Sequence, residues 1–399
     1  MREASRLAKA AFLVHGLTHS TQQAFESAQR APWWPATEAA LAPNALEGKV
    51  VAVTGANAGL GLATAAAVAR LGATTLLLCR SAERGAAAAD AIRAQLAAAG
   101  GEGGPPPPPP RLEVEQVDVS SLASVRAFAA RFEATGRPLH CLVNNAGILT
   151  PGGKQTVAFG GAEAAPASAA KSFEASFATN VLGPTALTLA LKPALLRAAA
   201  AAAASNGNGN GKDTPRVVFV SSGGMYTCPL LSEPPLDAPY AGEPGAAPGA
   251  PPFDGARAYS RDKRRQVCLA EALGRRWRAE GILVASFHPG WADTPGVQTS
   301  LPAFREKVLT RLRQPEGGAD TAVWMACAPA DLAAEGSAGD APGPIRPAAF
   351  YLDRRAQPKH LLGASGWLAG TAYTAAEADA LLTNVVALLR ECGDAGAAA

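Results

Sequence analysis

The sequence carries little charge of either sign. Asp, Glu, Lys and Arg make up only 17% of its 399 residues, and the formal net charge is +3. A protein whose main partner is nucleic acid or an anionic membrane usually shows a strong basic excess. The near balance of charge therefore argues against both partners.

Paired cysteines and long apolar runs are also missing. None of the six cysteines lies in Cys-x-x-Cys spacing, so no metal site or disulfide framework is predicted, and a reducing compartment is expected. No apolar run approaches the roughly 20 residues of a membrane-spanning helix. We therefore expect a cytoplasmic protein. The basic residues among the first 30 leave peripheral membrane association or organelle targeting as the alternative to an ordinary packed extension.

Strand-like and helix-like segments alternate from residue 47 onward. Strands are predicted at 49–54, 74–79, 112–117, 139–144, 216–221, 282–287 and 348–352. Helices are predicted at 60–71, 82–99, 121–134, 171–204 and 258–279, with two more before the last strand and a final one from Thr374, where Thr374 and Glu377 form a capping box. This order is typical of an α/β fold with a doubly wound parallel sheet, the Rossmann fold.

The alternation predicts one domain with two flanking parts. Residues 1–46 form an N-terminal extension packed on the domain, residues 47–370 the Rossmann domain, and residues 371–399 a C-terminal helix and tail. Three stretches rich in Pro, Gly, Ala or Asn, at 100–110, 198–213 and 228–252, lack the periodicity to pack. We predict that they are disordered surface loops.

The first predicted strand runs into a glycine-rich segment, Thr54–Gly61. Gly55, Gly59 and Gly61 allow a tight turn and a close approach of the backbone to a pyrophosphate. The helix that follows offers free N–H groups and the positive end of its dipole to the phosphates. A bare glycine turn is the alternative, but the strand before and the helix after favour a dinucleotide site.

The end of the second strand indicates which dinucleotide binds. An NAD enzyme usually has Asp or Glu there to bind the ribose 2′-hydroxyl, whereas this chain has Cys79, Arg80 and Ser81. Arg80, with Arg84 nearby, would instead pair with a 2′-phosphate. The sequence therefore predicts NADP(H), with a solvated surface arginine as the alternative.

Tyr259 and Lys263 lie four positions apart near the start of a predicted helix, so they share one face. An ammonium one turn away favours the phenolate, and we expect Lys263 to lower the pKa of Tyr259. This spacing is common by chance, and it gains meaning only downstream of a phosphate-binding loop.

Four motifs, in this order, resemble the short-chain dehydrogenase/reductase family. Thr54–Gly61 is similar to its TGxxxGxG signature, 144–147 to its NNAG motif, 259–263 to YxxxK, and 289–290 to the Pro-Gly after the sixth strand. Runs at 177–180, 220–225, 252–255 and 288–296 are also similar to members of this family. The likeness begins near Phe25, before the first strand, which favours an extension that belongs to the domain over a cleaved presequence.

The resemblance implies roles for individual residues. Ser222 would bind the substrate oxygen, with Ser221 as its neighbouring candidate; Tyr259 would exchange the proton, Lys263 would bind the nicotinamide ribose, and Asn180 would hold a water of a proton relay. The implied cofactor contacts come from Thr54, Gly55, Asn57, Gly59, Leu60, Gly61, Arg80, Asp118, Asn144, Ala146, Gly147, Tyr259, Lys263, Pro289, Gly290 and Thr294.

We therefore expect an NADP(H)-dependent oxidoreductase whose partner is a small carbonyl or alcohol, with a hydrophobic ketone or aldehyde favoured. A homo-oligomer is compatible with the sequence. The alternatives are an NADP-binding scaffold without turnover and a tetrapyrrole reductase of the same fold.

The segment between Ser222 and Tyr259 is longer than is usual in the family, at 37 positions. We hypothesise that residues 229–240 form a lid over an apolar substrate, with a disordered loop as the alternative. His288 is predicted to be structural. Trp291 would contact substrate or pack internally, and Trp33–Trp34 would belong to the core or to an interface.

Overall fold

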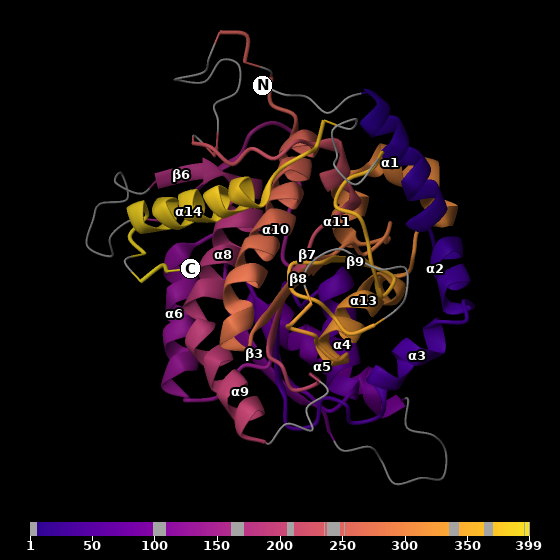
Figure 1. The fold of residues 1–399 in the computed structure, drawn as a ribbon, viewed down its shortest axis with the longest axis vertical. Helices are drawn as coiled ribbons and strands as arrows, with labels where there is room; N and C mark the ends of the chain where they lie inside the picture. The colour runs from indigo at the N-terminus through magenta and orange to yellow at the C-terminus, as the bar shows by residue number, and fades with distance from the viewer. Residues whose placement is uncertain are drawn as a thin grey trace.

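The computed structural model describes residues 6–98, 109–160, 171–205, 211–234, 236–237, 248–250, 252–334, 343–362, 370–394 and 396–398. An eight-stranded sheet lies at its centre, in the order β10-β9-β8-β7-β4-β1-β2-β3 (Figure 1). The strands are β1 (Val50–Thr54), β2 (Thr74–Cys79), β3 (Arg111–Gln116), β4 (Cys141–Asn144), β7 (Arg216–Val220), β8 (Leu283–Phe287), β9 (Phe350–Leu352) and β10 (Arg355–Ala356).

All neighbours in this sheet pair in parallel except β10, which is antiparallel to β9. The chain winds outward from β1 in both directions, so the strand order reverses between β1 and β4. Ligands of open α/β sheets bind outside the carboxyl ends of the strands at such a point. The predicted doubly wound Rossmann sheet is confirmed.

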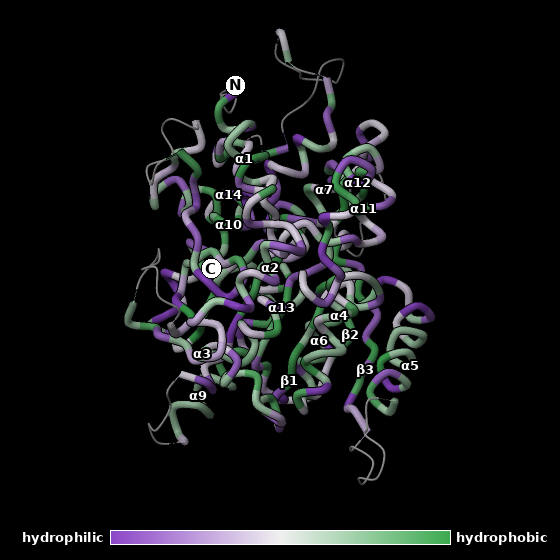
Figure 2. The backbone as a smooth tube through the Cα atoms, turned by 90° about the vertical axis from the view of Figure 1, so that its right-hand side faces the viewer, coloured by the Kyte–Doolittle hydropathy of each residue, from purple (hydrophilic) through white to green (hydrophobic). Residues whose placement is uncertain are grey.

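Helices cover both faces of the sheet because its inner strands are apolar on both sides. Every residue of β1, β4, β7 and β8 is buried, and Figure 2 shows the hydrophobic colour on β1. One core lies under α6 (Leu122–Ala134), α8 (Gly183–Ala190), α9 (Lys192–Ala204), α10 (Gly255–Trp277) and α14 (Ala375–Glu391). The other lies under α4 (Gly59–Arg70), α5 (Ala82–Ala98) and α13 (Pro315–Cys327).

The N-terminal segment packs along one side of the sheet. It consists of α1 (Arg6–His19), α2 (Gln22–Gln29), α3 (Trp34–Glu38) and a short 3₁₀ turn, Ala39–Leu41, and it runs down the right-hand edge in Figure 1. Trp34 is buried, and the Arg354 guanidinium carbon lies 4.0 Å from the centre of one of its rings. At least one member of the tryptophan pair is therefore a packing residue.

The long helix predicted at 171–204 is wrong at its start and in its continuity. Residues 171–174 form a strand, β6 (Lys171–Glu174), which pairs with β5 (Thr156–Gly160) in a separate two-stranded sheet. Helix α7 (Ala175–Phe177) begins where the Glu174 carboxylate accepts the N–H of Phe177. A π-turn (Ala178–Leu182) follows, and α8 and α9 meet at a 50° bend, where Pro193 in the first turn of α9 has no N–H to continue the ladder.

Three further predictions need correction. Between β8 and β9 the described residues form three α-helices, not two, namely α11 (Pro295–Ser300), α12 (Pro302–Val308) and α13. The alanine run from Ala198 belongs to α9 rather than to a loop, because alanine favours helix and Ala198 packs against the core. Residues 228–234 and 236–237 are packed, as described below, whereas 99–108 and 206–210 lie outside the described residues.

In the described residues, no single helix is both long and apolar enough to cross a bilayer, and only the bent pair Ala175–Ala190 and Lys192–Ala204 meets both criteria when taken together. The capping box at Thr374 and Glu377 is present at the start of α14.

Candidate active site

The glycine-rich turn between β1 and α4 leaves room that a side chain would fill. Gly55 adopts a φ of +65°, and a methyl group at Gly61 would overlap the carbonyl oxygen of Gly55. Helix α4 has no side-chain cap at its N-terminus, so its first N–H groups are available to an anion. The turn therefore fits the pyrophosphate of a dinucleotide.

Thr54 joins this turn to the segment after β4. Its Oγ1 accepts the backbone N–H groups of Asn145 and Ala146, both at 2.9 Å, while the Asn145 amide donates to the Thr54 carbonyl at 2.8 Å. The two segments that flank the reversal of strand order are thereby fixed to each other.

The segment after β4 brings three predicted residues together. A methyl group at Gly147 would lie 3.1 Å from Asn180 Oδ1 and 3.4 Å from Lys263 Nζ, so both side chains face this glycine. Asn144 is buried and donates to Thr188 Oγ1 at 2.9 Å, while its own Oδ1 has no partner. This buried acceptor, at the carboxyl end of β4, is one that a hydrogen-bond donor of a bound dinucleotide would satisfy.

The carboxyl ends of β2 and β3 present the residues expected at the adenosine. Arg80 is exposed directly after β2, and the Asn57 amide oxygen, in its hydrogen-bonding orientation, accepts from Arg84 at 3.0 and 3.2 Å. Asp118 accepts from the Ser120 hydroxyl and N–H at 2.6 and 2.9 Å. The basic side chains thus stand where an NAD enzyme would have an acid.

Thr294 lies beside the glycine-rich turn, since a methyl at Gly59 would come within 3.2 Å of its Cβ. Its Oγ1 accepts the N–H of Val297 and caps α11. Gly290 has a φ of +74°, and a side chain there would overlap the Arg313 guanidinium. Leu60 approaches Gly318 of α13 and so packs between helices.

Ser222, and not Ser221, meets Tyr259. The Ser221 hydroxyl is buried and donates to the Lys263 carbonyl at 2.8 Å. Ser222 begins the 3₁₀ turn η4 (Gly223–Thr227), accepts the N–H of Gly224 at 3.2 Å, and hydrogen-bonds to Tyr259. Of the two serines that the sequence left open, Ser222 is therefore the one that contacts Tyr259.

The pKa of Tyr259 differs from the expectation. Burial raises it to about 12, partly offset by the hydrogen bond from Ser222. Lys263 lies behind the ring, with Nζ 5.4 Å from its centre, and burial lowers the pKa of the ammonium to about 8. Desolvation outweighs the hydrogen bond from Ser222, and the expected lowering of the pKa by Lys263 is not seen, so the phenol is protonated at neutral pH.

Gln266, which sequence reasoning missed, connects Lys263 to Asn180. Its Oε1 accepts from Lys263 Nζ at 3.0 Å, and its Nε2 donates to the Asn180 carbonyl at 2.7 Å. The Asn180 side chain is used on the N–H and carbonyl of Ile148, both at 2.9 Å. Asn180 was expected to hold a water of a proton relay, but its side chain is already hydrogen-bonded to Ile148 and its backbone carbonyl to the Gln266 amide. The i,i+3 spacing of Lys263 and Gln266 was the available signal.

Asn180 itself lies in the π-turn between α7 and α8. Such single π-turns are frequent at functional sites, because the extra residue redirects a side chain or a carbonyl. The π-turn could not be predicted from the sequence, since the periodicity of 171–204 is that of a continuous helix.

A buried carboxyl pair lies next to this group. The Ser176 hydroxyl is 2.6 Å from Glu174 Oε2 and 2.8 Å from Asp262 Oδ2. Burial raises the pKa of Asp262 to about 7, although Arg265 opposes the shift. Asp262 precedes Lys263 in the chain and was not singled out from the sequence.

The described part of the proposed lid is held in place. Arg264 and Arg265 of α10 donate to the carbonyls of Cys228, Leu231 and Leu236, and Asn384 of α14 donates to that of Ser232. Leu236 belongs to the core under α14. This packing favours a fixed wall over a moving lid for residues 228–234 and 236–237, while 235 and 238–240 lie outside the described residues.

The comparisons with known proteins agree with this geometry. The short chain dehydrogenase family model matches residues 49–223. The chain is 32% identical to dehydrogenase/reductase SDR family member 12 from Bos taurus over 96% of this chain and 97% of that protein. It is 30% identical to retinol dehydrogenase 14 and 33% identical to polyprenol dehydrogenase, both from Mus musculus, over 72% and 71% of this chain and 76% and 72% of those proteins.

Among solved structures, an uncharacterized protein from Mycobacterium paratuberculosis has a TM-score of 0.53 at 25% identity, covering 86% of this chain and 94% of that one. The motif order, the sheet and the relative matched over nearly its whole length lead to one conclusion: this chain belongs to the short-chain dehydrogenase/reductase family of oxidoreductases.

Proposed function

We propose that the protein is an NADP(H)-dependent oxidoreductase that interconverts a hydrophobic carbonyl compound and its alcohol. The observation that carries the proposal is the contact of Ser222 with Tyr259, with Lys263 buried behind the ring and the glycine-rich turn alongside. The nicotinamide, when bound, supplies or accepts the hydride.

Tyr259 is the proton donor in the direction of reduction. Because its pKa is about 12, the phenol keeps its proton at neutral pH until the substrate oxygen gains negative charge. Ser222 orients that oxygen through its hydroxyl. In the direction of oxidation Tyr259 must accept the proton, and the Lys263 ammonium stabilises the resulting phenolate.

Lys263 has a second role at the cofactor. Two of its three N–H groups are used on Val220 O, at 2.7 Å, and on Gln266 Oε1. These bonds fix the ammonium, and the third N–H is left for the ribose. Preorganising a donor in this way avoids a reorganisation cost when the substrate reacts.

The preference for NADP(H) rests on Arg80, directly after β2, and on Arg84, in the first turn of α5. A hydrogen bond to a charged group contributes about 1.5–3 kcal/mol, so loss of the arginine contact should weaken NADPH binding about 10- to 100-fold. Titration of the wild type and Arg80→Asp with NADPH and NADH tests this. Equal affinity of the wild type for both would refute the preference.

The hydrophobic substrate is supported by two observations. The relatives include proteins named for retinol and polyprenol, and Ile148, beside Asn180, is a large apolar side chain that is 38% exposed. A panel of long-chain, polycyclic and small carbonyls with NADPH tests the class. Faster turnover of the small polar carbonyls would contradict it.

The proposed chemistry is tested by Tyr259→Phe. We expect turnover to fall at least about 100-fold with NADPH affinity nearly unchanged, because only the proton donor is lost. Lys263→Ala should lower both the turnover rate and the affinity for NADPH. If no member of the panel is turned over while NADPH still binds, the alternative of a scaffold without turnover is favoured.

A further inference from the structure

His288 connects the N-terminal extension to the turn that carries Ser222. It follows β8, is 2% exposed, and lies with Nδ1 3.1 Å from the Gly223 nitrogen and Nε2 3.1 Å from Ser20 Oγ. A backbone N–H can only donate, so Nδ1 is the acceptor. The ring proton of the neutral imidazole is therefore on Nε2, where it donates to Ser20.

The imidazole of His288 is neutral at neutral pH. Burial holds the pKa of His288 well below its usual range, and the charges of Arg313 and His15 act in the same direction. A second proton, on Nδ1, would face the Gly223 N–H directly. The two hydrogen bonds therefore persist throughout the neutral pH range.

The turn after Ser222 is packed closely between His288 and α1. A methyl group at Gly223 would lie 2.9 Å from His288 Nε2 and 3.0 Å from the Phe12 ring of α1. Further along the turn, the rings of Tyr226 and His15 are 5.4 Å apart. The position of Ser222 is thus set by the extension on one side and by α10 on the other.

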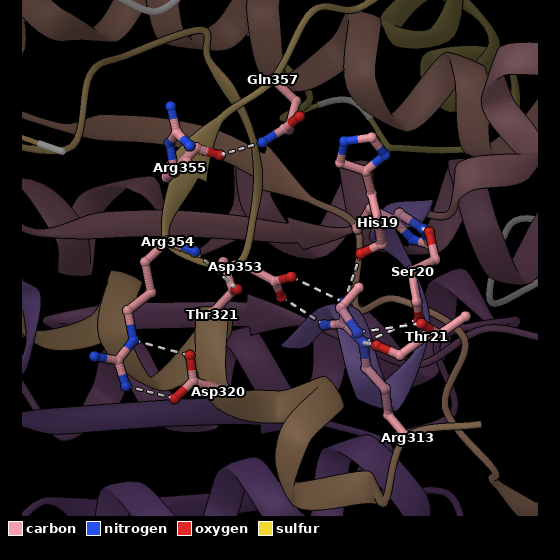
Figure 3. Close-up of polar contacts among 12 residues, drawn as sticks. His19, Ser20, Thr21, Arg313, Asp320, Thr321, Asp353, Arg354, Arg355 and Gln357 are labelled. Atoms are coloured by element: carbon pink, nitrogen blue, oxygen red, sulfur yellow. Dashed lines mark hydrogen bonds and ion pairs between the residues drawn. The ribbon is translucent and has the colours of Figure 1, made fainter. Parts of the chain in front are cut away.

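The extension is itself rigidly held at Ser20, as Figure 3 shows. Arg313 donates to the carbonyls of His19, Ser20 and Thr21 and forms a two-bond ion pair with Asp353. Ser20, Thr21 and Asp353 are buried, so Ser20 has a fixed place from which to orient His288.

The N-terminal extension also holds Trp291 in place. The backbone N–H of Trp291 donates to the Ser20 carbonyl at 2.7 Å, and a methyl at Gly16 would overlap the Trp291 indole. Trp291 also packs edge-on against Phe304 of α12, with ring centres 5.1 Å apart. Trp291 therefore packs internally, which is one of the two roles that the sequence left open.

We propose that the N-terminal extension is a working part of the active site, in which Ser20 and His288 are positioning residues for Ser222; this rests on the role of Ser222 under the proposed function. Neither residue touches the reacting atoms. They act by holding the Gly223 N–H, and a small displacement of a reacting group costs up to about 100-fold in rate.

The two nitrogens of His288 can be tested separately. His288→Asn places an amide oxygen near Nδ1, so it keeps the acceptor for Gly223 and loses Ser20. His288→Gln places an amide nitrogen near Nε2, so it keeps Ser20 and loses Gly223. We expect kcat to fall about 10- to 100-fold in His288→Gln and less than about threefold in His288→Asn, with KM and NADPH affinity unchanged in both.

A matched control and a double-mutant cycle distinguish positioning from general damage. His140 also accepts a backbone N–H at Nδ1, from Val50 at 3.0 Å, but at the opposite end of the sheet; His140→Asn and His140→Gln should have equal kcat. Ser222→Ala should mask His288→Gln, so that the double variant is no slower than Ser222→Ala alone.

Each outcome is judged together with thermal melting and NADPH titration of the same samples. Equal kcat in His288→Asn and His288→Gln, or additive losses with Ser222→Ala, would overturn the inference. Ser20→Ala, the milder change, should lower kcat a few-fold, and it keeps the test open if a His288 variant fails to fold. A wild type without turnover would instead count against the proposed function.

Discussion

The buried pair Glu174 and Asp262 makes a quantitative prediction about pH and stability. The single proton of the Ser176 hydroxyl can be donated to only one of the two carboxylates that it contacts, at 2.6 and 2.8 Å. The other contact requires a protonated carboxyl as donor. Asp262, which is 2% exposed and has its pKa raised to about 7, is the group that we expect to carry this proton.

The sign of the effect follows from linkage. A carboxyl whose folded-state pKa is raised contributes stability that is complete below its unfolded pKa, and this is lost as pH rises to the folded value. For Asp262 the window runs from its ordinary value of 3.8 to about 7. At about 1.4 kcal/mol per pH unit, the full loss is about 4 kcal/mol, of which about 2–3 kcal/mol falls between pH 5 and pH 7.5.

Asp262→Asn removes this titration, because an amide keeps a donor for Ser176 and never ionises. The free energy of unfolding of the variant relative to wild type should therefore rise by about 2–3 kcal/mol between pH 5 and pH 7.5. Urea denaturation at both pH values measures this. Asp90→Asn is the control, since its side chain is 77% exposed and its effect should not change with pH. A difference for Asp262→Asn that stays within about 0.5 kcal/mol would refute the shared proton.

Three further outcomes are expected. Thr54→Val should destabilise the fold by about 2–4 kcal/mol and weaken NADPH binding, because valine leaves the N–H groups of Asn145 and Ala146 without their acceptor. Thr54→Ser keeps the hydroxyl and should do neither. Similar denaturation curves for the two variants would contradict this. In reduction, kcat/KM should fall above about pH 8, where Lys263 loses its proton. Lys263→Arg should abolish this decline at high pH. If the decline persists in Lys263→Arg, it must come from the titration of another group. Arg313→Met should cost about 3–5 kcal/mol in denaturant unfolding, since it leaves Asp353 buried without its cation. Arg305→Met, at a more exposed pair, should cost much less, because water solvates the charge that is left. Equal losses of stability in the two variants would show that burial of the ion pair does not determine its contribution.

The parts of the molecule that the sequence predicted are those fixed by short stretches of chain. The β1–α4 turn needs glycine at Gly55 because of its positive φ and at Gly61 because of its close approach to another carbonyl. The shared face of Tyr259 and Lys263 follows from one helical turn. Both features depend on residues within eight positions of one another, where backbone geometry leaves few choices.

What the sequence could not predict depends on contacts between distant segments. The β5–β6 hairpin is formed by strands too short to show a period. The sharing of a proton by Asp262 involves Ser176, 86 positions away. The pKa of Tyr259 was expected to be lowered by Lys263, but burial, which only the folded structure sets, raises it instead.

The attachment of Ser20 to Arg313 has a consequence for biosynthesis. The two residues are 293 positions apart, and Thr37 and Arg354, which also bond, are 317 apart. At about 5–20 residues per second, translation leaves the first helices without their partners for roughly 15–60 seconds. During that time the Phe12 and Phe25 side chains, which later meet Trp291 and Arg313, are open to solvent and to chaperones. The N-terminal helices are thus made long before their partners and are among the last of the described elements to reach their final place.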